Sequence, residues 1–120
     1  MSTPEIIFVF GSNVNGFHAG GAARYALDHY GAIWGAGYGL QGNAYAIPTM
    51  DHEMQTLSVD AIADHVAEFI SFARERQQMS FLVTAIGCGI AGHDPADIGP
   101  LFAGVPENVF LSGKLTAALR

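Results

Sequence analysis

FVFGSNVNGFHAGGAA, residues 8–23, is the stretch that decides the fold of this chain. It continues an apolar run, Ile6–Phe10, whose continuous hydrophobicity is typical of a strand buried on both faces. The run breaks at Gly11–Asn13, and the pair Gly20–Gly21 precedes a helix of small residues. Glycines between a buried strand and a helix let the backbone approach a ligand and leave N–H groups at the helix N-terminus unpaired. The stretch therefore predicts a site for phosphate or another anion.

A second stretch repeats this order of features. The apolar run Phe81–Ile86 predicts another buried strand, and the glycine-rich loop Gly87–Gly92 follows it. Ligands of α/β sheets bind at the carboxyl ends of the strands. We therefore expect the two runs to be neighbouring strands, with both loops at one end of the sheet around one ligand.

The composition bounds the class of protein. A length of 120 residues indicates one domain, 1–120, and with 50% hydrophobic residues it needs no disulfide or metal for stability. The formal charge of −6, with only five Lys and Arg, argues against nucleic-acid binding. The single cysteine fits a reducing compartment, and we see no signal peptide and no membrane-spanning run. These features predict a cytoplasmic protein. Its low charge and high apolar content predict a homodimer or larger closed assembly.

Strands and helices are expected to alternate along the chain. Gly31 should stop the first helix and Pro48 should end the second strand, while Ser58 and Asp94 should cap later helices. The predicted strands are Ile6–Phe10, Ala44–Ile47, Phe81–Ile86 and Val109–Leu111, and the predicted helices are Ala22–Tyr30, 59–76, Pro95–Phe102 and Leu115–Arg120. This order predicts an α/β three-layer sandwich with a mixed, mostly parallel central sheet.

The glycine loops resemble those of the macrodomain superfamily, whose members bind ADP-ribose and related nucleotides. The family has an Asn-bearing turn after a buried strand, and Gly11–Asn13 occupies that place here. The family's glycine run at the start of a helix corresponds to Gly20–Ala22, and its later glycine-rich loop corresponds to Gly87–Gly92. The turn Gly39-Leu40 and the strand Tyr45–Pro48 also match in order. The resemblance extends over residues 6–111 and is greatest to small phage-type proteins. Only five residues precede the first strand, so the family's acidic residue for the adenine amine has no counterpart here.

The resemblance implies a set of candidate site residues. Asn13 would orient a ribose hydroxyl or a water, or else cap its own turn. His18 would be the general acid/base or a phosphate ligand, or else a surface histidine without a role. Cys88 reads either as a nucleophile or, more often for such a cysteine, as a small hydrophobe. The candidate ligand-binding residues are Gly11, Ser12, Asn13, Gly20, Gly21, Ala22, Tyr38, Gly87, Cys88, Gly89, Ile90, Ala91 and Gly92.

Three functions remain open at this point. The first is binding of an ADP-ribose-type nucleotide, or a cyclic or cleaved relative, with hydrolysis at the ribose assisted by Asn13 and His18. The second is a non-catalytic nucleotide sponge, and the third is a structural protein that kept the fold and lost the site. No metal site and no cofactor are expected, because no second histidine falls at ligand spacing from His52.

Overall fold

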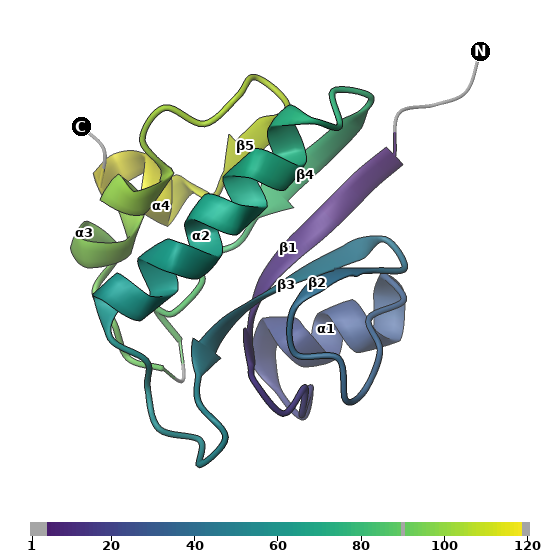
Figure 1. Cartoon of the computed structure of the whole chain (residues 1–120), viewed down its shortest axis with the longest axis vertical. Coiled ribbons are helices and arrows are strands. Elements are labelled where there is room, and N and C mark those ends of the chain that lie inside the picture. Colours follow the sequence, from purple (N-terminus) through teal and green to yellow (C-terminus); the bar gives the residue numbers. More distant parts are fainter. Residues whose placement is uncertain (1–4, 90, 119–120) are drawn as a thin grey trace.

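The computed structural model describes residues 5–89 and 91–118, and it is an α/β fold (Figure 1). The described part contains five strands in one mixed, mostly parallel sheet and four α-helices. The elements are β1 (Glu5–Asn13), α1 (Gly21–His29), β2 (Gly39–Gln41), β3 (Ala44–Met50), α2 (Val59–Arg74), β4 (Met79–Val83), α3 (Pro95–Ile98), the 3₁₀ turn η1 (Gly99–Phe102), β5 (Val109–Leu111) and α4 (Gly113–Ala118).

The sheet is centred on β1. The strand order is β2-β3-β1-β4-β5, in which only β2 runs antiparallel to its neighbour. Phe8 of β1 is opposite Ala44 of β3 on one side and Leu82 of β4 on the other. This confirms that the two apolar runs are neighbouring parallel strands, so their carboxyl ends lie at the same edge of the sheet.

The two faces of β1 belong to two different cores. Ile7 and Val9 pack with Phe69 of α2 in the larger core, whereas Phe10 packs with Ala26 of α1 in the smaller one. Alternate side chains of a strand point to opposite faces, so α1 and α2 cover opposite faces of the sheet. Figure 1 shows α2 lying across the near face and α1 beyond the strands. Burial on both sides explains why the sequence of β1 is continuously apolar.

Two strands are longer than predicted because a neighbouring strand overrides local preference. Residues Gly11–Asn13 were expected in a loop but continue β1, since β3 pairs with them as far as Asn13↔Met50. Pro48 was expected to end its strand but lies inside β3. β2 pairs with β3 only as far as Ala46, so Pro48 lies beyond the end of β2, where no ladder partner on that side needs its missing N–H.

β4 ends earlier than the apolar run suggests. It stops at Val83, and Thr84 then turns back to β1, with both its N–H and its hydroxyl donating to the Val9 carbonyl at 3.1 and 2.8 Å. Ala85 and Ile86, predicted as strand, therefore belong to the loop. The ladder between β1 and β4 ends at the pair Val9↔Val83.

The predicted capping residues act as expected, but α2 ends at Arg74 and not at 76, and the predicted helix Pro95–Phe102 is α-helical only to Ile98 and continues as η1. Ser58 Oγ accepts from the Ala61 N–H at 3.2 Å at the start of α2, and Asp94 Oδ1 accepts from the Ala96 N–H at 2.9 Å at the start of α3. Gly31, with φ of +77°, follows the C-cap of α1. The predicted last helix is α4, and positions 119–120 of that prediction lie outside the described residues. Among the described residues, no helix has the length and apolar character needed to cross a membrane.

Candidate functional site

A cavity of about 350 Å³ lies where the ladder between β1 and β4 ends. The chain leaves β1 for α1 on one face of the sheet and leaves β4 for α3 on the other, because α3 packs into the core of Ile7 and Val9. Such a divergence is the topological switch point at which α/β sheets bind ligands. The cavity is lined by residues of segments 11–13, 17–23, 49–54 and 84–91, so the two predicted loops do meet at one site.

The start of α1 forms one wall of the cavity. Its N-cap is Gly20, which supplies no side-chain acceptor. The first intrahelical bond is that of the Arg24 N–H to the Gly20 carbonyl at 3.2 Å, so the N–H groups of Gly21, Ala22 and Ala23 have no partner within the helix. A Cβ built on Gly20 or Gly21 would meet no atom within 4 Å. The wall therefore presents backbone donors beside open space.

The loop after β4 forms the opposite wall. Gly87 adopts φ of +70°, which favours glycine, and its N–H lies 3.3 Å from a Cβ built on Gly11 of β1. The backbone of β1 and the backbone of the loop after β4 thus approach each other closely at the floor of the cavity. On the far side of the loop, Thr56 Oγ1 donates to the Ala91 carbonyl at 2.9 Å and ties the loop to the segment before α2.

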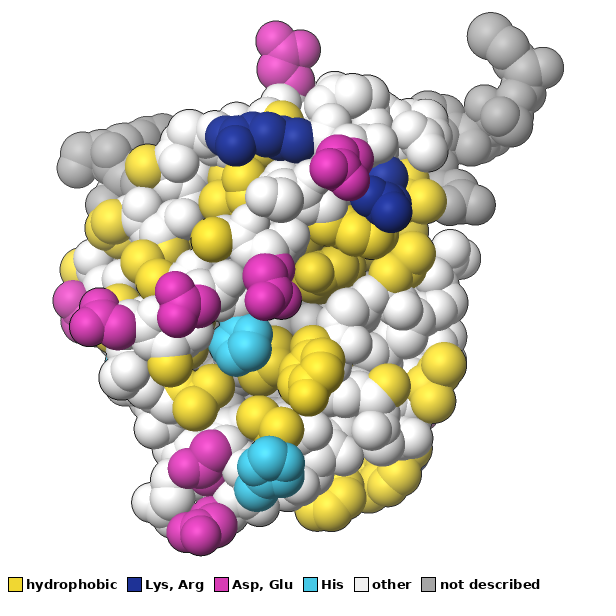
Figure 2. Space-filling model, viewed as in Figure 1, with side chains coloured by type: hydrophobic (Ala, Val, Ile, Leu, Met, Phe, Trp, Pro, Cys, Tyr) yellow, Lys and Arg dark blue, Asp and Glu magenta, His cyan; other side chains and the backbone are white. Residues whose placement is uncertain are grey.

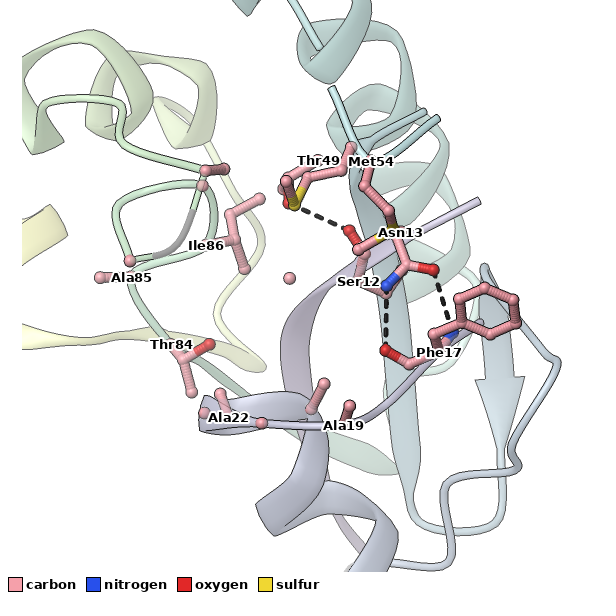
Figure 3. Close-up of a pocket in the computed structure, with 18 residues that line it drawn as sticks. Ser12, Asn13, Phe17, Ala19, Ala22, Thr49, Met54, Thr84, Ala85 and Ile86 are labelled. Atoms are coloured by element: carbon pink, nitrogen blue, oxygen red, sulfur yellow. Dashed lines mark hydrogen bonds between the residues drawn. The ribbon is translucent and has the colours of Figure 1, made fainter. Parts of the chain in front are cut away.

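The end of β1 forms the third side, and its polar side chains are already engaged (Figure 3). Asn13 is 5% exposed, and its amide makes two hydrogen bonds to the backbone of Phe17, at 2.9 and 3.0 Å. Ser12 Oγ donates to the Gly37 carbonyl, and the Ser12 carbonyl accepts from Thr49 Oγ1 at 3.0 Å. These side chains position the loop after β1. For Asn13 this is the second of the two interpretations given above, in which it caps its own turn.

The structure corrects the expectation that His18 acts in the site. His18 has no exposed surface and does not line the cavity. Its ring lies edge-on to Phe10, and Nε2 lies 3.1 Å from the Ala36 carbonyl and 3.2 Å from Gln41 Oε1. The loop folds inward here because Phe10 and the small side chains of α1 leave room for the imidazole in the smaller core. A buried ring in this position cannot reach a ligand.

Three further candidates are not brought to the cavity. Tyr38 is 60% exposed and stacks on His65, and Gly92 lies beyond the lining part of its loop. Cys88 contacts the larger core instead, and burial, followed by the nearby Asp94 carboxylate, raises the pKa of its thiol against the opposing effect of Lys114. A raised pKa contradicts an activated nucleophile. Ile90 lies outside the described residues.

The other candidates do line the cavity. They are Gly11, Ser12, Asn13, Gly20, Gly21, Ala22, Gly87, Gly89 and Ala91. Sequence reasoning missed Phe17, Ala19, Ala23, Thr49, Met50, Met54, Thr84, Ala85 and Ile86. Thr84–Ile86 carried a signal, because they end an apolar run, but they were assigned to the strand. Met54 carried none, since its segment comes near β1 only through the pairing of β3.

No charged side chain lines the cavity among the described residues. Arg24 points elsewhere and forms an exposed ion pair with Asp28 at 3.0 Å. On the face that carries α2, the dark blue Lys and Arg side chains gather toward the end of α2 and not toward the end of β1 (Figure 2). Within the described ranges, no three His, Cys, Asp or Glu residues gather to hold a metal ion. The described residues that line the cavity therefore offer a ligand only uncharged groups.

Comparisons of the chain with protein-family models, with curated proteins and with solved structures gave no match.

Proposed function

We propose that this chain is a macrodomain-like three-layer α/β protein that binds an ADP-ribose-type nucleotide, or a cyclic or cleaved relative, with its phosphate and ribose part in the cavity. The observation that carries the proposal is the start of α1, where unpaired N–H groups and two open glycines line a cavity at the switch point. Helix N-termini and glycine loops bind phosphate through backbone donors and the helix dipole. This mechanism lets an acidic protein bind an anion without lysine or arginine.

The size of the cavity supports the phosphate and ribose assignment. Its volume of about 350 Å³ is close to the lower end of the range for ligand pockets, roughly 300–1,000 Å³. A complete ADP-ribose would thus extend past the rim, with its phosphates against the start of α1.

Binding without turnover is the form of this function that the site favours. No Asp, Glu, His, Lys, Arg or Cys is among the described residues lining the cavity, and the Asn13 amide is engaged with Phe17. General acid–base catalysis needs a titratable group within hydrogen-bond reach of the reacting atom. We therefore favour a nucleotide sponge, which binds its ligand without turnover, over a hydrolase.

Isothermal titration with ADP-ribose, its cyclic forms and NAD, followed by chromatography of each mixture, tests the proposal. We expect one of these ligands to bind and to be recovered unchanged. Recovery of a cleaved product would overturn the sponge and restore the hydrolase. Absence of binding by all of them would leave the structural-protein alternative.

We also propose that the chain forms a closed homo-oligomer. Leu82 and Phe110 are register partners on β4 and β5, and they are 41% and 52% exposed on the sheet face where α1 covers β1. Neighbouring copies of a chain with a net charge of −6 repel one another, and an uncharged apolar row is where that repulsion is smallest. A second copy of the chain is the occupant that we assign to this row.

A further inference from the structure

Two aromatic rings are stacked at the rim of the cavity in spite of being exposed. Phe17 and Trp34 have ring centroids 5.7 Å apart and planes inclined by 22°. Their exposed fractions are 46% and 54%. Phe17 itself lines the cavity, on the side of Asn13 and away from Thr84 and Ala85 (Figure 3). The pair presents apolar ring surface to solvent directly beside the cavity.

The backbone on both sides of this pair is fixed. Asn13 holds Phe17 through its amide, and the Gly35 N–H donates to the Gly16 carbonyl at 2.9 Å. A Cβ built on Gly16 would lie 2.3 Å from the Gly35 carbonyl carbon, so the two loops are in direct contact. The rings are therefore held by their loops and do not depend on burial for their position.

Met54 completes this rim from a third loop. It lines the cavity, is 41% exposed, and adopts φ of +61°, a conformation that is costly for a side chain with a Cβ. Asp51 Oδ1 fixes the turn by accepting from the Gln55 N–H at 3.0 Å, and Asn15 Nδ2 ties it to the loop after β1 by donating to the His52 carbonyl at 2.8 Å. The rim thus consists of three linked loops that each present an apolar side chain.

We infer that Phe17 and Trp34 form the platform on which the nucleobase of the bound nucleotide stacks, with Met54 beside it. This inference rests on the proposed function, because it needs the phosphates to occupy the start of α1. Phe17 is the one aromatic residue among the described residues that line the cavity, so a base extending past the rim on the side of Asn13 reaches its ring. A flat π-face is how proteins bind bases without hydrogen-bonding their edges. A platform ordered in advance also lowers the entropic cost of binding.

The chain carries its own reporter for this contact. Trp34 is the single tryptophan of the sequence, so fluorescence excited selectively at tryptophan, without exciting the four tyrosines, reports on the platform. Stacking of a base on the pair quenches that fluorescence. We expect ADP-ribose to quench it in a saturable way. Ribose 5-phosphate, which has the sugar and phosphate but no base, should bind in a calorimetric titration without quenching.

Variants separate the platform from the phosphate site. Because stacking on an aromatic side chain contributes roughly 1–3 kcal/mol per base, Phe17→Ala and Trp34→Ala should each weaken ADP-ribose binding about 5- to 150-fold. Both should leave the affinity for ribose 5-phosphate unchanged. Tyr38→Ala is the matched control, since Tyr38 is also exposed but does not line the cavity, and it should bind ADP-ribose like the wild type.

The outcomes distinguish the two proposals. If the wild type binds ADP-ribose and both platform variants bind it equally well, the platform is wrong and the proposed function stands. If ribose 5-phosphate binds and ADP-ribose neither binds more tightly nor quenches, the same conclusion follows. If the wild type binds neither of these two ligands, nor the cyclic forms and NAD, the proposed function fails and the platform fails with it.

Discussion

Asn13 holds the main chain of Phe17 through both atoms of its amide. Oδ1 accepts from the Phe17 N–H at 2.9 Å, and Nδ2 donates to the Phe17 carbonyl at 3.0 Å. The Gly16 N–H also donates to the Asn13 carbonyl at 2.9 Å, which forms the backbone hydrogen bond of the turn. One side chain at the end of β1 therefore sets the path of the chain toward α1 and the position of the Phe17 ring.

Removing this clamp should cost stability and affinity together. Asn13→Ala leaves the part-buried N–H and carbonyl of Phe17 without their side-chain partner, so we expect a loss of about 1–2 kcal/mol in the free energy of unfolding, measured by urea denaturation. Nucleotide affinity should fall as well, because the loop is no longer fixed. Asn15→Ala is the control, since Asn15 makes one exposed bond to the His52 carbonyl and should cost less. Equal stability of the Asn13 variant and the wild type would contradict the clamp.

The two glycines at the start of α1 should respond differently to valine. Gly20 has an extended φ of −159°, which valine adopts without strain, so Gly20→Val should lose at most the preference of an N-cap for glycine, about 1 kcal/mol of stability, and at least tenfold in affinity, roughly 1.4 kcal/mol. Gly21 has φ of +59°, so Gly21→Val should abolish binding and also destabilise the fold by about 1–2 kcal/mol. Calorimetric titration and thermal unfolding separate the two effects.

Arg24→Ala is the matched control for the glycine variants. Arg24 belongs to the same helix but pairs with Asp28 at the surface, where an ion pair contributes about 0–1 kcal/mol. Its removal should leave affinity unchanged, and the affinity of the wild type should depend only weakly on salt concentration. Loss of binding in Arg24→Ala with normal binding in Gly21→Val would refute recognition by the backbone.

The fold was largely predictable from the sequence, and the site only in part. Burial of β1 on both faces and the apolar stripe of α2 are local patterns, so their elements were predicted correctly. The ends of β1 and β3 were not, because the pairing of Asn13 with Met50 and the absence of β2 beside Pro48 are properties of the sheet. His18 was misplaced for the same reason. A histidine in a glycine-rich loop resembles a surface residue until Phe10 and α1 provide a buried space for it.

Cys88 should react slowly with alkylating reagents. Its pKa is raised, chiefly by burial and then by Asp94, so at a pH near the ordinary thiol value a smaller fraction is thiolate in the folded protein than in the unfolded chain. Iodoacetamide labelling at pH 8 should therefore be slower in buffer than in urea, and raising the pH should speed the reaction of the folded protein. Faster labelling of the folded protein would restore the nucleophile interpretation.

Asn108 should be among the most sensitive positions for stability. Its Nδ2 lies 3.0 Å from the Ala73 and Arg76 carbonyls and 3.1 Å from the Met79 carbonyl, so it joins the end of α2 to the start of β4. Asn108→Ala should lower the free energy of unfolding by about 1–3 kcal/mol, and Asn108→Asp by more, because it sets a carboxylate against carbonyl oxygens. Urea denaturation measures both. Asn43→Ala, at an exposed position, should change little.

Self-association should depend on the row formed by Leu82 and Phe110. We expect the wild type to be a dimer or larger by light scattering at micromolar concentration, and Phe110→Glu to be a monomer, because a carboxylate would be buried without a partner. Tyr38→Glu changes an equally exposed ring elsewhere and should keep the wild-type mass. A monomeric wild type, or an unchanged mass in Phe110→Glu, would count against the homo-oligomer.

The backbone origin of the α1 wall decides how its importance can be detected by mutagenesis. The donors of Gly21, Ala22 and Ala23 belong to peptide groups, which a change to alanine does not remove, and two of the three positions are alanine already. An alanine scan would therefore leave all three donors in place, and at Gly21 it would report the strain of a Cβ at positive φ and not the loss of an N–H. Nucleotide affinity falls only when a substitution adds atoms that fill the cavity or when it introduces proline. Proline removes the backbone N–H yet is tolerated in the first turn of a helix. Ala22→Pro is accordingly the substitution that subtracts a single N–H from the wall.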